Sequence, residues 1–238
     1  MKRTTVIYHS ADYDGIFCRE IAKKFLGTEG VSYIGWNFGD PPIPVPTGGE
    51  TFVMDLPLDK PFGRNSLNFA VGGSLVWIDH HKSAIESHPK DIPGYRIDGV
   101  AACRLAWQWF SGGVVSNSDT GNPPSLPSKH HFIDRVVSEP IAVRLAGEYD
   151  VWDHRGWDLE FQFGLDSQPS IDWESLLQND DTAEDTVFNV VRDGHAAMRC
   201  YAKRDADVML SRSFMVEWEG LRFLCLNTAR CNSNTFVE

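Results

Sequence analysis

Short apolar runs alternate with amphipathic stretches along the first hundred residues. Residues 5–8 form a β-branched and aromatic run that predicts a strand, and residues 15–26 repeat apolar positions at helical spacing. Gly27 follows as a typical helix C-cap. Three more short apolar runs predict strands at residues 31–36, 51–54 and 74–78. This alternation favours an α/β fold with a mostly parallel sheet flanked by helices.

Segments rich in proline, glycine, serine and asparagine separate these elements. Residues 40–49 and 113–128 have this composition and predict loops. Residues 100–110 predict a helix, and residues 130–147 predict largely helical structure with an interruption near Pro140. These helices continue the alternation that is typical of a parallel sheet covered on both faces.

The last third of the chain has a different pattern. Apolar positions between residues 182 and 211 have the spacing of one long helix. Residues 214–218 and 221–226 then predict a hairpin. A hairpin is rarely stable alone, so we expect an incomplete lobe, or one completed by another chain, as in a homo-oligomer. The predicted organisation is an α/β domain over residues 1–180, a connecting helix over 181–212 and a partial C-terminal lobe over 213–238.

The chain is acidic overall. It has 33 acidic and 22 basic residues and a formal net charge of −11. This charge repels nucleic-acid backbones at long range, which excludes a protein that coats duplex DNA. A small phosphorylated substrate stays compatible with it, because a bound cation reverses the local sign.

The cysteines and the apolar stretches of the chain indicate its cellular compartment. The five cysteines form no C-x-x-C pair, which predicts free thiols and argues against a zinc ribbon or a thioredoxin-type motif. The apolar stretch at the N-terminus is too short for a signal peptide. No run approaches the roughly 18–20 apolar residues that span a bilayer. We therefore expect a cytoplasmic protein with no membrane partner.

Acidic residues and histidines follow the predicted strands where each strand ends. Because the C-terminal ends of parallel strands share one edge of the sheet, these side chains are expected to converge. Crowded carboxylates and imidazoles lose solvation and repel one another unless divalent cations compensate them. The motifs are His9-Ser10-Ala11-Asp12-Tyr13-Asp14-Gly15, Asp55, Asp79-His80-His81 and a later Glu148-Tyr149-Asp150.

The donor types in these motifs indicate the chemistry. A carboxylate and imidazole set without cysteine suits Mn²⁺, Mg²⁺, Fe²⁺ or Zn²⁺. Two such cations about 3.5–4 Å apart, bridged by a carboxylate and a water, form a phosphoryl-transfer site, where hydroxide is available near neutral pH. Such a hydrolase needs no protein nucleophile. The chain has neither a Walker A motif nor a G-x-S-x-G motif.

Each motif also has a purely structural interpretation. Asp12 and Asp14 are typical helix N-cap residues, and Asp55 is typical of the start of a turn. An exposed turn after a strand would explain the Asp-His-His triplet taken alone. The competing ligand candidates in the last motif are Asp150, Asp153 and Glu148.

Several residues outside the motifs leave two interpretations open. Arg104 either reaches a substrate phosphate or forms a surface salt bridge. His130 and His131 are typical of a solvated helix start, and His195 in the long helix is structural or exposed. The tryptophans that either pack in the core or stack on a base are Trp107, Trp109, Trp152 and Trp157.

The four motifs resemble those of the DHH phosphoesterase superfamily, which is named for an Asp-His-His triplet. In this chain the triplet is Asp79-His80-His81, and the motifs follow in the superfamily's order from His9 to Asp150. The superfamily includes RecJ-like exonucleases, nano-RNA and cyclic-dinucleotide-product phosphodiesterases, exopolyphosphatases and family II inorganic pyrophosphatases. A lone triplet is weak support, whereas four ordered motifs at strand ends are specific.

The resemblance implies a role for each motif residue. The implied cofactors are two divalent ions, Mn²⁺ or else Mg²⁺, and Asp55 would bridge them. His81 would face the scissile phosphate and stabilise or protonate the leaving oxygen, while Asp79 would orient a ligand histidine. The implied ligands are His9 and Asp12 for one ion, and Asp14, His80 and Asp150 for the other.

Two features depart from the superfamily's pattern. Several members place the two aspartates four and six residues after the histidine, whereas Asp12 and Asp14 follow His9 by three and five. The exonuclease and phosphodiesterase members carry a substrate-binding domain with a Gly-Gly-Gly-His signature, which this chain lacks. Residues 214–230 are similar to the start of that domain, which implies a truncated or degenerate substrate-binding lobe.

The resemblance implies a metal-dependent hydrolase that cleaves phosphoester bonds with metal-activated water. Short oligonucleotides are the preferred substrates, because the partial C-terminal lobe resembles the start of the substrate-binding domain of the nuclease-like members. Other small phosphorylated substrates are also compatible. A polyphosphatase or pyrophosphatase is an alternative within the same class. The missing signature motivates an alternative of another class, a non-catalytic protein that binds metal and nucleotide.

Overall fold

Five parallel strands form the central sheet. The computed structural model describes residues 3–63, 73–112 and 126–226. The strands lie in the order β2-β1-β3-β4-β5, and all neighbouring pairs are parallel. Their bounds are β1 (Thr4–His9), β2 (Val31–Trp36), β3 (Gly49–Met54), β4 (Gly73–Asp79) and β5 (Gly94–Arg96). The predicted α/β class is therefore confirmed.

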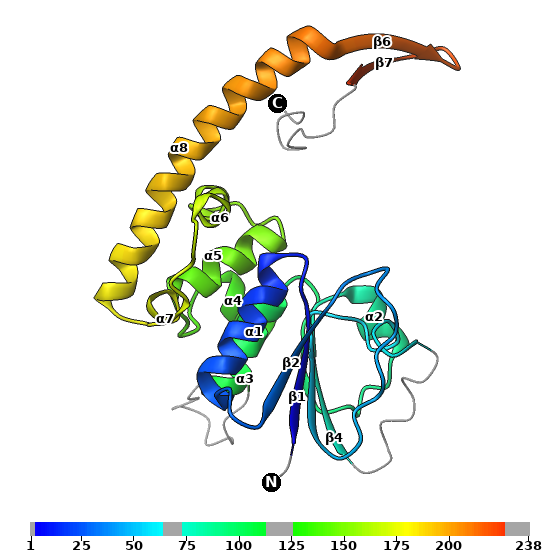
Figure 1. Cartoon of the computed structure of the whole chain (residues 1–238), viewed down its shortest axis with the longest axis vertical. Helices are drawn as coiled ribbons and strands as arrows, with labels where there is room; N and C mark the ends of the chain where they lie inside the picture. Colours follow the sequence, from blue (N-terminus) through cyan, green and yellow to red (C-terminus); the bar gives the residue numbers. More distant parts are fainter. Residues whose placement is uncertain (1–2, 64–72, 113–125, 227–238) are drawn as a thin grey trace. The chain divides into compact units, whose positions relative to one another are not determined.

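Helices lie on both faces of this sheet (Figure 1). Helices α1 (Tyr13–Leu26) and α3 (Ala102–Ser111) pack against each other, α1 on β1 and α3 on β4 and β5. Helix α2 (Lys82–Ser87) lies on the other side, where Ala84 joins a second apolar core. The sheet is thus covered on both faces, as parallel sheets are in α/β proteins.

The central strands β1, β3 and β4 are buried on both sides. Ile7, Val53 and Trp77 pack with Leu56 and Phe62 in the core on the α2 side. Side chains alternate along a strand, so the buried residues next to these three point to the opposite face. Those residues are Val6, Phe52 and Val76. The alternation explains why the strands appear in the sequence as continuous apolar runs.

Shorter helices follow the sheet. They are α4 (Lys129–Ile133), α5 (Ile141–Asp150), α6 (Asp158–Ser167) and α7 (Trp173–Leu176). The predicted interruption near Pro140 is confirmed and covers residues 134–140. Strand β5 and helices α2, α6 and α7 were not predicted. Most of the loop predicted at residues 113–128 lies outside the described residues.

The predicted long helix and hairpin are confirmed. Helix α8 (Asp181–Arg212) has 32 residues, and strands β6 (Ser213–Trp218) and β7 (Leu221–Leu226) form an antiparallel pair. Glu219 and Gly220 form the turn with positive φ angles of 51° and 76°. Two positive φ angles match the right-handed twist of a hairpin.

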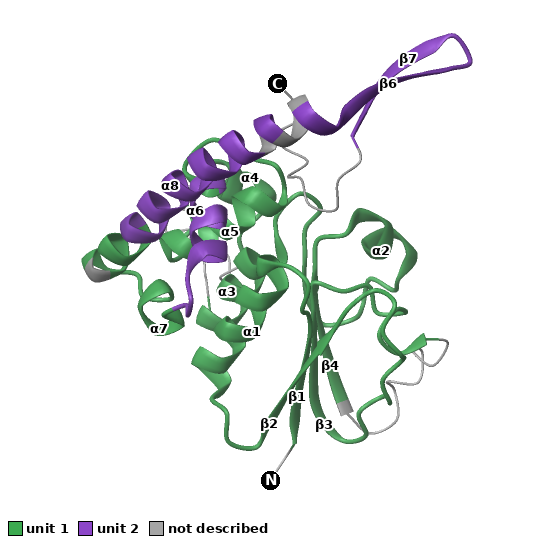
Figure 2. Ribbon diagram, turned by 45° about the horizontal axis from the view of Figure 1, so that its top comes forward, with its two compact units in different colours: residues 1–158, 172–187 green, residues 159–171, 188–238 purple. Residues whose placement is uncertain are grey.

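Internal contacts divide the chain into two compact units (Figure 2). Unit 1 comprises residues 1–158 and 172–187, and unit 2 comprises residues 159–171 and 188–238. Within unit 2, α6 approaches α8 closely at Gly194, where an added Cβ would lie 1.7 Å from the Glu160 carbonyl oxygen. The functional division predicted at residues 181 and 213 stays a prediction.

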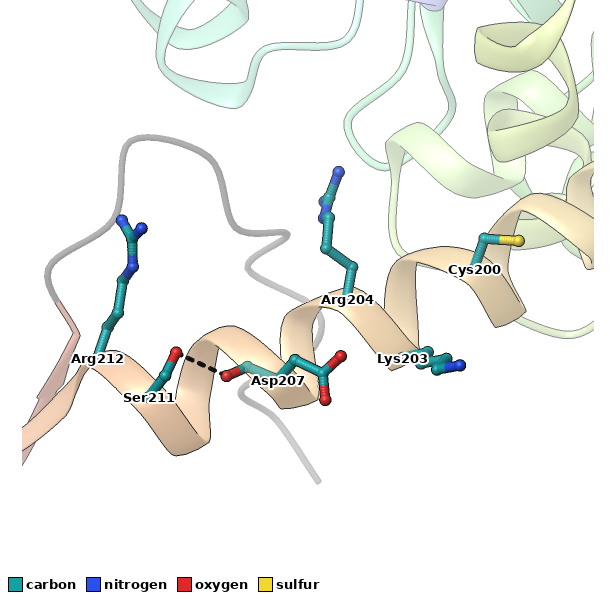
Figure 3. Close-up of a pocket in the computed structure, with 6 residues that line it drawn as sticks. All are labelled: Cys200, Lys203, Arg204, Asp207, Ser211 and Arg212. Atoms are coloured by element: carbon teal, nitrogen blue, oxygen red, sulfur yellow. Dashed lines mark hydrogen bonds between the residues drawn. The ribbon is translucent and has the colours of Figure 1, made fainter.

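The C-terminal half of α8 carries a hollow of about 440 Å³ (Figure 3). Ser211 Oγ donates a hydrogen bond to the Asp207 carbonyl oxygen at 2.8 Å within it. The residues that line it are Cys200, Lys203, Arg204, Asp207, Ser211 and Arg212. Within the described ranges, no helix combines the length and the apolar character needed to cross a membrane.

Candidate metal centre

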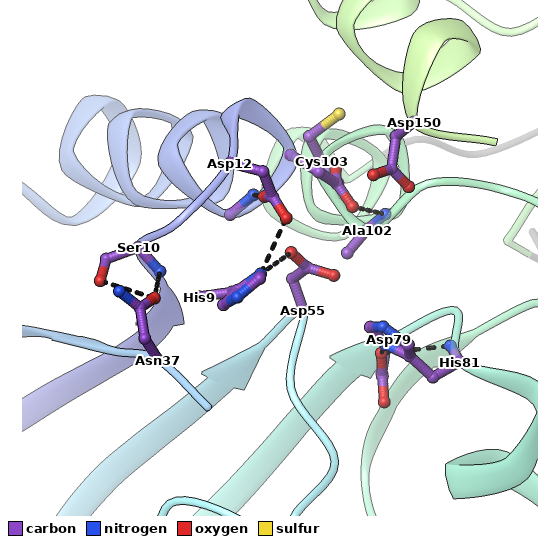
Figure 4. Close-up of polar contacts among 12 residues, drawn as sticks. His9, Ser10, Asp12, Asn37, Asp55, Asp79, His81, Ala102, Cys103 and Asp150 are labelled. Carbon is purple, nitrogen blue, oxygen red and sulfur yellow. Dashed lines mark hydrogen bonds and ion pairs between the residues drawn. The ribbon is translucent and has the colours of Figure 1, made fainter. Parts of the chain in front are cut away.

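Six side chains from separate parts of unit 1 meet at the C-terminal edge of the sheet. Figure 4 labels four of them, which are His9, Asp12, Asp55 and Asp150. The six side chains come from the ends of β1, β3 and β4, the start of α1 and the last residue of α5. We call them the acid–histidine cluster, and they are His9, Asp12, Asp14, Asp55, His80 and Asp150. All six were predicted from the sequence, and the structure brings all six together.

The first half of the cluster is centred on His9. Its Nδ1 lies 2.9 Å from Asp12 Oδ2 and 3.4 Å from Asp55 Oδ2. One ligand atom from each of these three residues falls within 4.8 Å of the others, which is close enough for one cation.

The second half is centred on His80. Its Nε2 lies 3.3 Å from Asp150 Oδ2, 3.4 Å from Asp55 Oδ1 and 3.6 Å from Asp14 Oδ2. Asp14, His80 and Asp150 again offer ligand atoms within 4.8 Å of one another. Asp55 contacts both histidines, one with each carboxylate oxygen. The geometry therefore has two halves that share Asp55.

Backbone contacts fix Asp55 and Asp14. Asp55 follows β3 with a φ of 56°, and its N–H donates to the Ile78 carbonyl oxygen of β4 at 2.9 Å. The Asp14 carboxylate accepts from the backbone N–H groups of Ala102 and Cys103 at 2.8 and 2.6 Å. Those two groups lie at the N-terminus of α3, where a helix favours negative charge.

Asp12 caps α1 as well as belonging to the cluster. Its Oδ1 accepts from the Gly15 N–H at 3.1 Å, while its Oδ2 faces His9. The structural and functional interpretations of Asp12 therefore both hold. For Asp14 the N-cap interpretation is wrong, because Asp14 lies inside α1 and its carboxylate is bound by α3. Gly15 allows this packing, since an added Cβ would lie 1.9 Å from the His9 carbonyl oxygen.

Asp79 holds the two histidines that follow it. Its Oδ1 accepts from the backbone N–H of His80 at 2.8 Å and lies 2.7 Å from Nδ1 of His81. Asp79 is fully buried, whereas the His81 side chain is 37% exposed. The ring that Asp79 orients is therefore that of His81, and its contact with His80 is through the backbone.

The carboxylates raise the pKa values of both histidines. Hydrogen bonding to Asp12, and then to Asp55, raises the pKa of His9 to about 10. Burial alone would lower the pKa of His80, but the hydrogen bond with Asp55 and the surrounding carboxylates raise it to about 10. Without a bound cation, these imidazoles supply the positive charge that the carboxylates require.

Burial and crowding also shift the pKa values of the carboxyl groups. Burial, and then repulsion from Asp55, raises the pKa of Asp14 to about 7. Burial, and then repulsion from Asp14, raises the pKa of Asp150 to about 7. Partial burial would raise the pKa of Asp12, but its hydrogen bond with His9 lowers it. The buried aspartates therefore resist ionising together, and a cation would relieve this.

A buried oxygen of Asp150 supports the fit of a cation. Asp150 Oδ2 makes no hydrogen bond with any described residue, and His80 Nε2 lies 3.3 Å from it. A buried carboxylate oxygen without a hydrogen bond is costly unless a positive charge faces it. With its two imidazoles and four carboxylates, the donor set fits a divalent cation such as Mn²⁺, Mg²⁺, Fe²⁺ or Zn²⁺.

The two competing candidates near Asp150 are bound elsewhere. The Arg135 guanidinium donates to both Glu148 oxygens at 2.7 and 2.8 Å. Arg155 Nε donates to Asp153 Oδ1 at 2.6 Å. Both acids therefore form ion pairs with arginines, and the structure places only Asp150 in the cluster.

Arg104 does not lie in the cluster. It is 3% exposed, and its Nε donates to the Glu139 carboxylate at 3.0 Å while Nη2 donates to the Phe132 carbonyl oxygen at 3.3 Å. Arg104 does form a salt bridge, but the prediction that it lies at the surface is wrong, because both partners are buried. The predicted contact with a substrate phosphate lacks support, because Glu139 already binds the guanidinium.

Outside the motifs, the structural interpretations of His130 and His195 hold, whereas core packing is wrong for two of the four tryptophans. His130 is exposed at the start of α4, and the His195 side chain is 61% exposed. Trp107 is buried, whereas Trp152 and Trp157 are 70% and 57% exposed.

One neighbour of the cluster was not predicted. Phe38 follows β2, and its ring centroid lies 5.6 Å from that of His9. Strand β2 was predicted, and it ends at the same sheet edge as β1. The residues that follow β2 include no acid or histidine before Asp40, so no charged motif marks the position of Phe38 in the sequence.

Comparisons with known proteins name neither a family nor a function. No family model matches the chain. No curated protein matches it. One similar solved structure is described as an uncharacterized protein from Helicobacter pylori G27, with 11% identity, a TM-score of 0.46 and coverage of 92% of this chain and 74% of that chain. A likeness this distant carries no functional argument.

Proposed function

We propose that the chain is a metal-dependent phosphoesterase of the DHH type. The observation that carries the proposal is the acid–histidine cluster, in which the Asp55 carboxylate lies between His9 and His80 and contacts both. The order of the four motifs, which resembles that of the DHH superfamily, supports it. The proposed reaction is hydrolysis of a phosphoester bond in a short oligonucleotide or another small phosphorylated molecule.

The cluster supplies the ligands for two divalent cations, Mn²⁺ or Mg²⁺. His9 and Asp12 would hold one, Asp14, His80 and Asp150 the other, and Asp55 both. Two cations held there supply charge neutralisation for the phosphoryl oxygens and lower the pKa of water. The contacts from α3 to Asp14 and from β4 to Asp55 keep these ligands in place.

His81 is the proposed proton donor. Asp79 holds its Nδ1, which leaves the other ring nitrogen for the substrate. The hydrogen bond with Asp79 raises the pKa of His81. A raised pKa keeps the imidazolium populated nearer neutral pH, so that His81 can donate a proton to the leaving oxygen.

The proposed partners and location follow from the same chemistry. Bound cations would attract a small phosphorylated substrate to the site even though the protein is acidic overall. The net charge of −11 repels the phosphate backbone of a duplex. The cysteines Cys18, Cys103, Cys200 and Cys225 are free, which supports action in the reducing cytoplasm.

The proposal is tested by turnover and metal binding with matched variants. The purified chain with Mn²⁺ is assayed against pApA, bis-p-nitrophenyl phosphate and polyphosphate. We expect Asp55→Asn to lower turnover at least about 100-fold and to weaken Mn²⁺ binding about 10- to 100-fold. Asparagine tolerates the left-handed conformation at this position, so the backbone is preserved.

Asp153→Asn is the matched control. Asp153 is also an aspartate near the end of α5, but it pairs with Arg155 outside the cluster. We expect this variant to keep turnover and Mn²⁺ affinity within about twofold. Mn²⁺ binding without turnover of any substrate would support a non-catalytic binding protein instead. Equal effects of the two substitutions would contradict the proposed ligand set.

A further inference from the structure

Phe38 is an exposed aromatic residue in direct contact with the proposed metal site. Its side chain is 55% exposed, although it belongs to an ordered segment that follows β2. Its ring packs edge-to-face against His9, with centroids 5.6 Å apart. Much of the ring thus faces solvent beside a proposed metal ligand.

The segment around Phe38 is fixed on both sides. The ring also packs edge-to-face against Trp36, which is 5% exposed, with centroids 5.7 Å apart. Asn37 accepts hydrogen bonds from the backbone N–H and the hydroxyl of Ser10 at 3.2 and 3.1 Å (Figure 4). The Asn37 N–H donates in turn to Asp40 Oδ2 at 2.8 Å. These contacts hold Phe38 as a preformed surface.

The charge of the surroundings indicates what such a surface can bind. The acid–histidine cluster would contact a phosphoryl group only through cations, and it offers nothing apolar to the rest of a substrate. Phe38 adds a flat, uncharged surface beside His9. A nucleobase is the aromatic part of a nucleotide, and its stacking on an aromatic side chain does not depend on base identity.

We propose that Phe38 stacks on a nucleobase of the substrate and so determines specificity for short oligonucleotides over inorganic polyphosphate. This inference rests on the proposed function and deepens it. Phe38 is a specificity-determining residue for the base next to the scissile phosphate, and takes no part in the chemical step.

A thermodynamic cycle tests this proposal by removing the Phe38 side chain and the base of the ligand, separately and together. Calorimetry with the Mn²⁺-loaded full chain measures Kd for a phosphorothioate dinucleotide and for the same molecule with abasic sugars. Phe38→Ala is expected to weaken binding of the base-bearing ligand about tenfold or more, and that of the abasic ligand less than twofold. Phe38→Trp is expected to restore the base-dependent affinity.

Two controls separate stacking from damage to the site. Mn²⁺ affinity of Phe38→Ala should stay within about twofold, which shows that His9 is still in place. Phe25→Ala removes another partly exposed phenyl ring, about 16 Å away along α1 from Asp14, and should leave both ligands unaffected.

The outcomes distinguish this inference from the proposed function. If Phe38→Ala loses the same affinity for the base-bearing and the abasic ligand, the stacking proposal is overturned. Equal affinity of the native chain for the two ligands would also overturn it. If the chain binds the base-bearing ligand more tightly than the abasic one but turns over no substrate, the phosphoesterase proposal alone is overturned. If neither ligand binds the Mn²⁺-loaded chain, the stacking proposal is also overturned.

Discussion

Asp55 combines an uncommon backbone conformation with a central place in the site. Its φ of 56° lies in the left-handed region, and its carboxylate is 2% exposed between His9 and His80. A non-glycine residue held in this region costs free energy, and such strain clusters at functional sites. The hydrogen bond to Ile78 and the two histidine contacts hold Asp55 there.

The pKa values of the cluster predict how metal binding depends on pH. Asp14 and Asp150 have pKa values of about 7, and His9 and His80 of about 10. A proton must leave each protonated group before it can coordinate a cation, so lower pH weakens binding. From pH 8 to pH 6 we expect Mn²⁺ affinity to fall by at least about tenfold per pH unit. Calorimetry in two buffers with different ionisation enthalpies also counts the released protons.

Asp150→Asn provides the matched variant for this dependence. It removes one titrating carboxyl group, so the Mn²⁺ affinity should fall. The dependence of that affinity on pH should also become less steep. Mn²⁺ affinity that does not change between pH 6 and 8 would contradict the proposed ligands.

Residue types at strand ends predicted the cluster well. His9 is the last residue of β1, and Asp55 and His80 directly follow β3 and β4, so strand prediction and the shared sheet edge were sufficient. The environment of Arg104 was not predictable in this way. Its partner Glu139 lies in the irregular segment between α4 and α5, and no local pattern reports such a distant contact.

At the scale of elements, α1 and β1 approach closely where the site begins. An added Cβ at Gly15 would lie 1.9 Å from the His9 carbonyl oxygen, a backbone atom that cannot move aside as the end of a flexible side chain can. Gly15→Ala should therefore lower the free energy of unfolding by about 1–3 kcal/mol and weaken Mn²⁺ binding, because His9 and Asp14 must move apart. Chemical denaturation and calorimetry measure both effects.

Gly156→Ala is the control for Gly15→Ala. An added Cβ at Gly156 would meet its nearest atom, Arg135 Nη2, at 3.6 Å, which is ordinary contact. Its stability and Mn²⁺ affinity should stay close to those of the native chain. Unchanged stability of Gly15→Ala would show that α1 does not need this close approach.

The buried pair of Arg104 and Glu139 connects α3 to the segment before α5. Arg104→Met leaves the Glu139 carboxylate buried without its partner, so the free energy of unfolding should fall by about 3–5 kcal/mol. Because the pair lies outside the cluster, Mn²⁺ affinity and turnover of the folded fraction should stay within about threefold.

The double variant Arg104→Met, Glu139→Gln separates stability from function in this test. It removes both charges and should recover part of the lost stability. If turnover stays low in a double variant that is stable, Arg104 acts on the substrate and the structural role proposed for it is wrong.

Element length explains which parts of the fold the sequence predicted. Residues 31–36, 74–78 and 182–211 carry clear periodic patterns, and the structure has β2, β4 and α8 there. Strand β5 has three residues and α7 has four, too few for a periodic pattern. Such short elements form because neighbouring elements support them, as the pairing of β5 with β4 illustrates.

At the scale of the whole molecule, bound metal should stabilise the unit that contains the cluster. All six cluster residues belong to unit 1. Mn²⁺ at about 100 times its Kd should stabilise that unit by about 2.7 kcal/mol for each bound ion, which for two ions corresponds to a rise in Tm of about 10–20 °C. Differential scanning calorimetry with Mn²⁺ and with EDTA measures the shift.

Unit 2 provides the internal comparison. Hydrogen exchange of α6 and of the β6–β7 hairpin should change little with Mn²⁺, while that of α1 and of the ends of β1, β3 and β4 should slow. Equal protection of both units, or none in unit 1, would contradict a metal site confined to the cluster.

The central claim is that the six cluster residues hold a pair of divalent cations. Anomalous diffraction from crystals grown with Mn²⁺ tests it most directly. We predict two peaks within coordination distance of the cluster side chains and about 3.5–4 Å from each other, with Asp55 in contact with both. Peaks at other acidic residues, or no peak among the six side chains, would contradict it. The cluster residues to be inspected are His9, Asp12, Asp14, Asp55, His80 and Asp150.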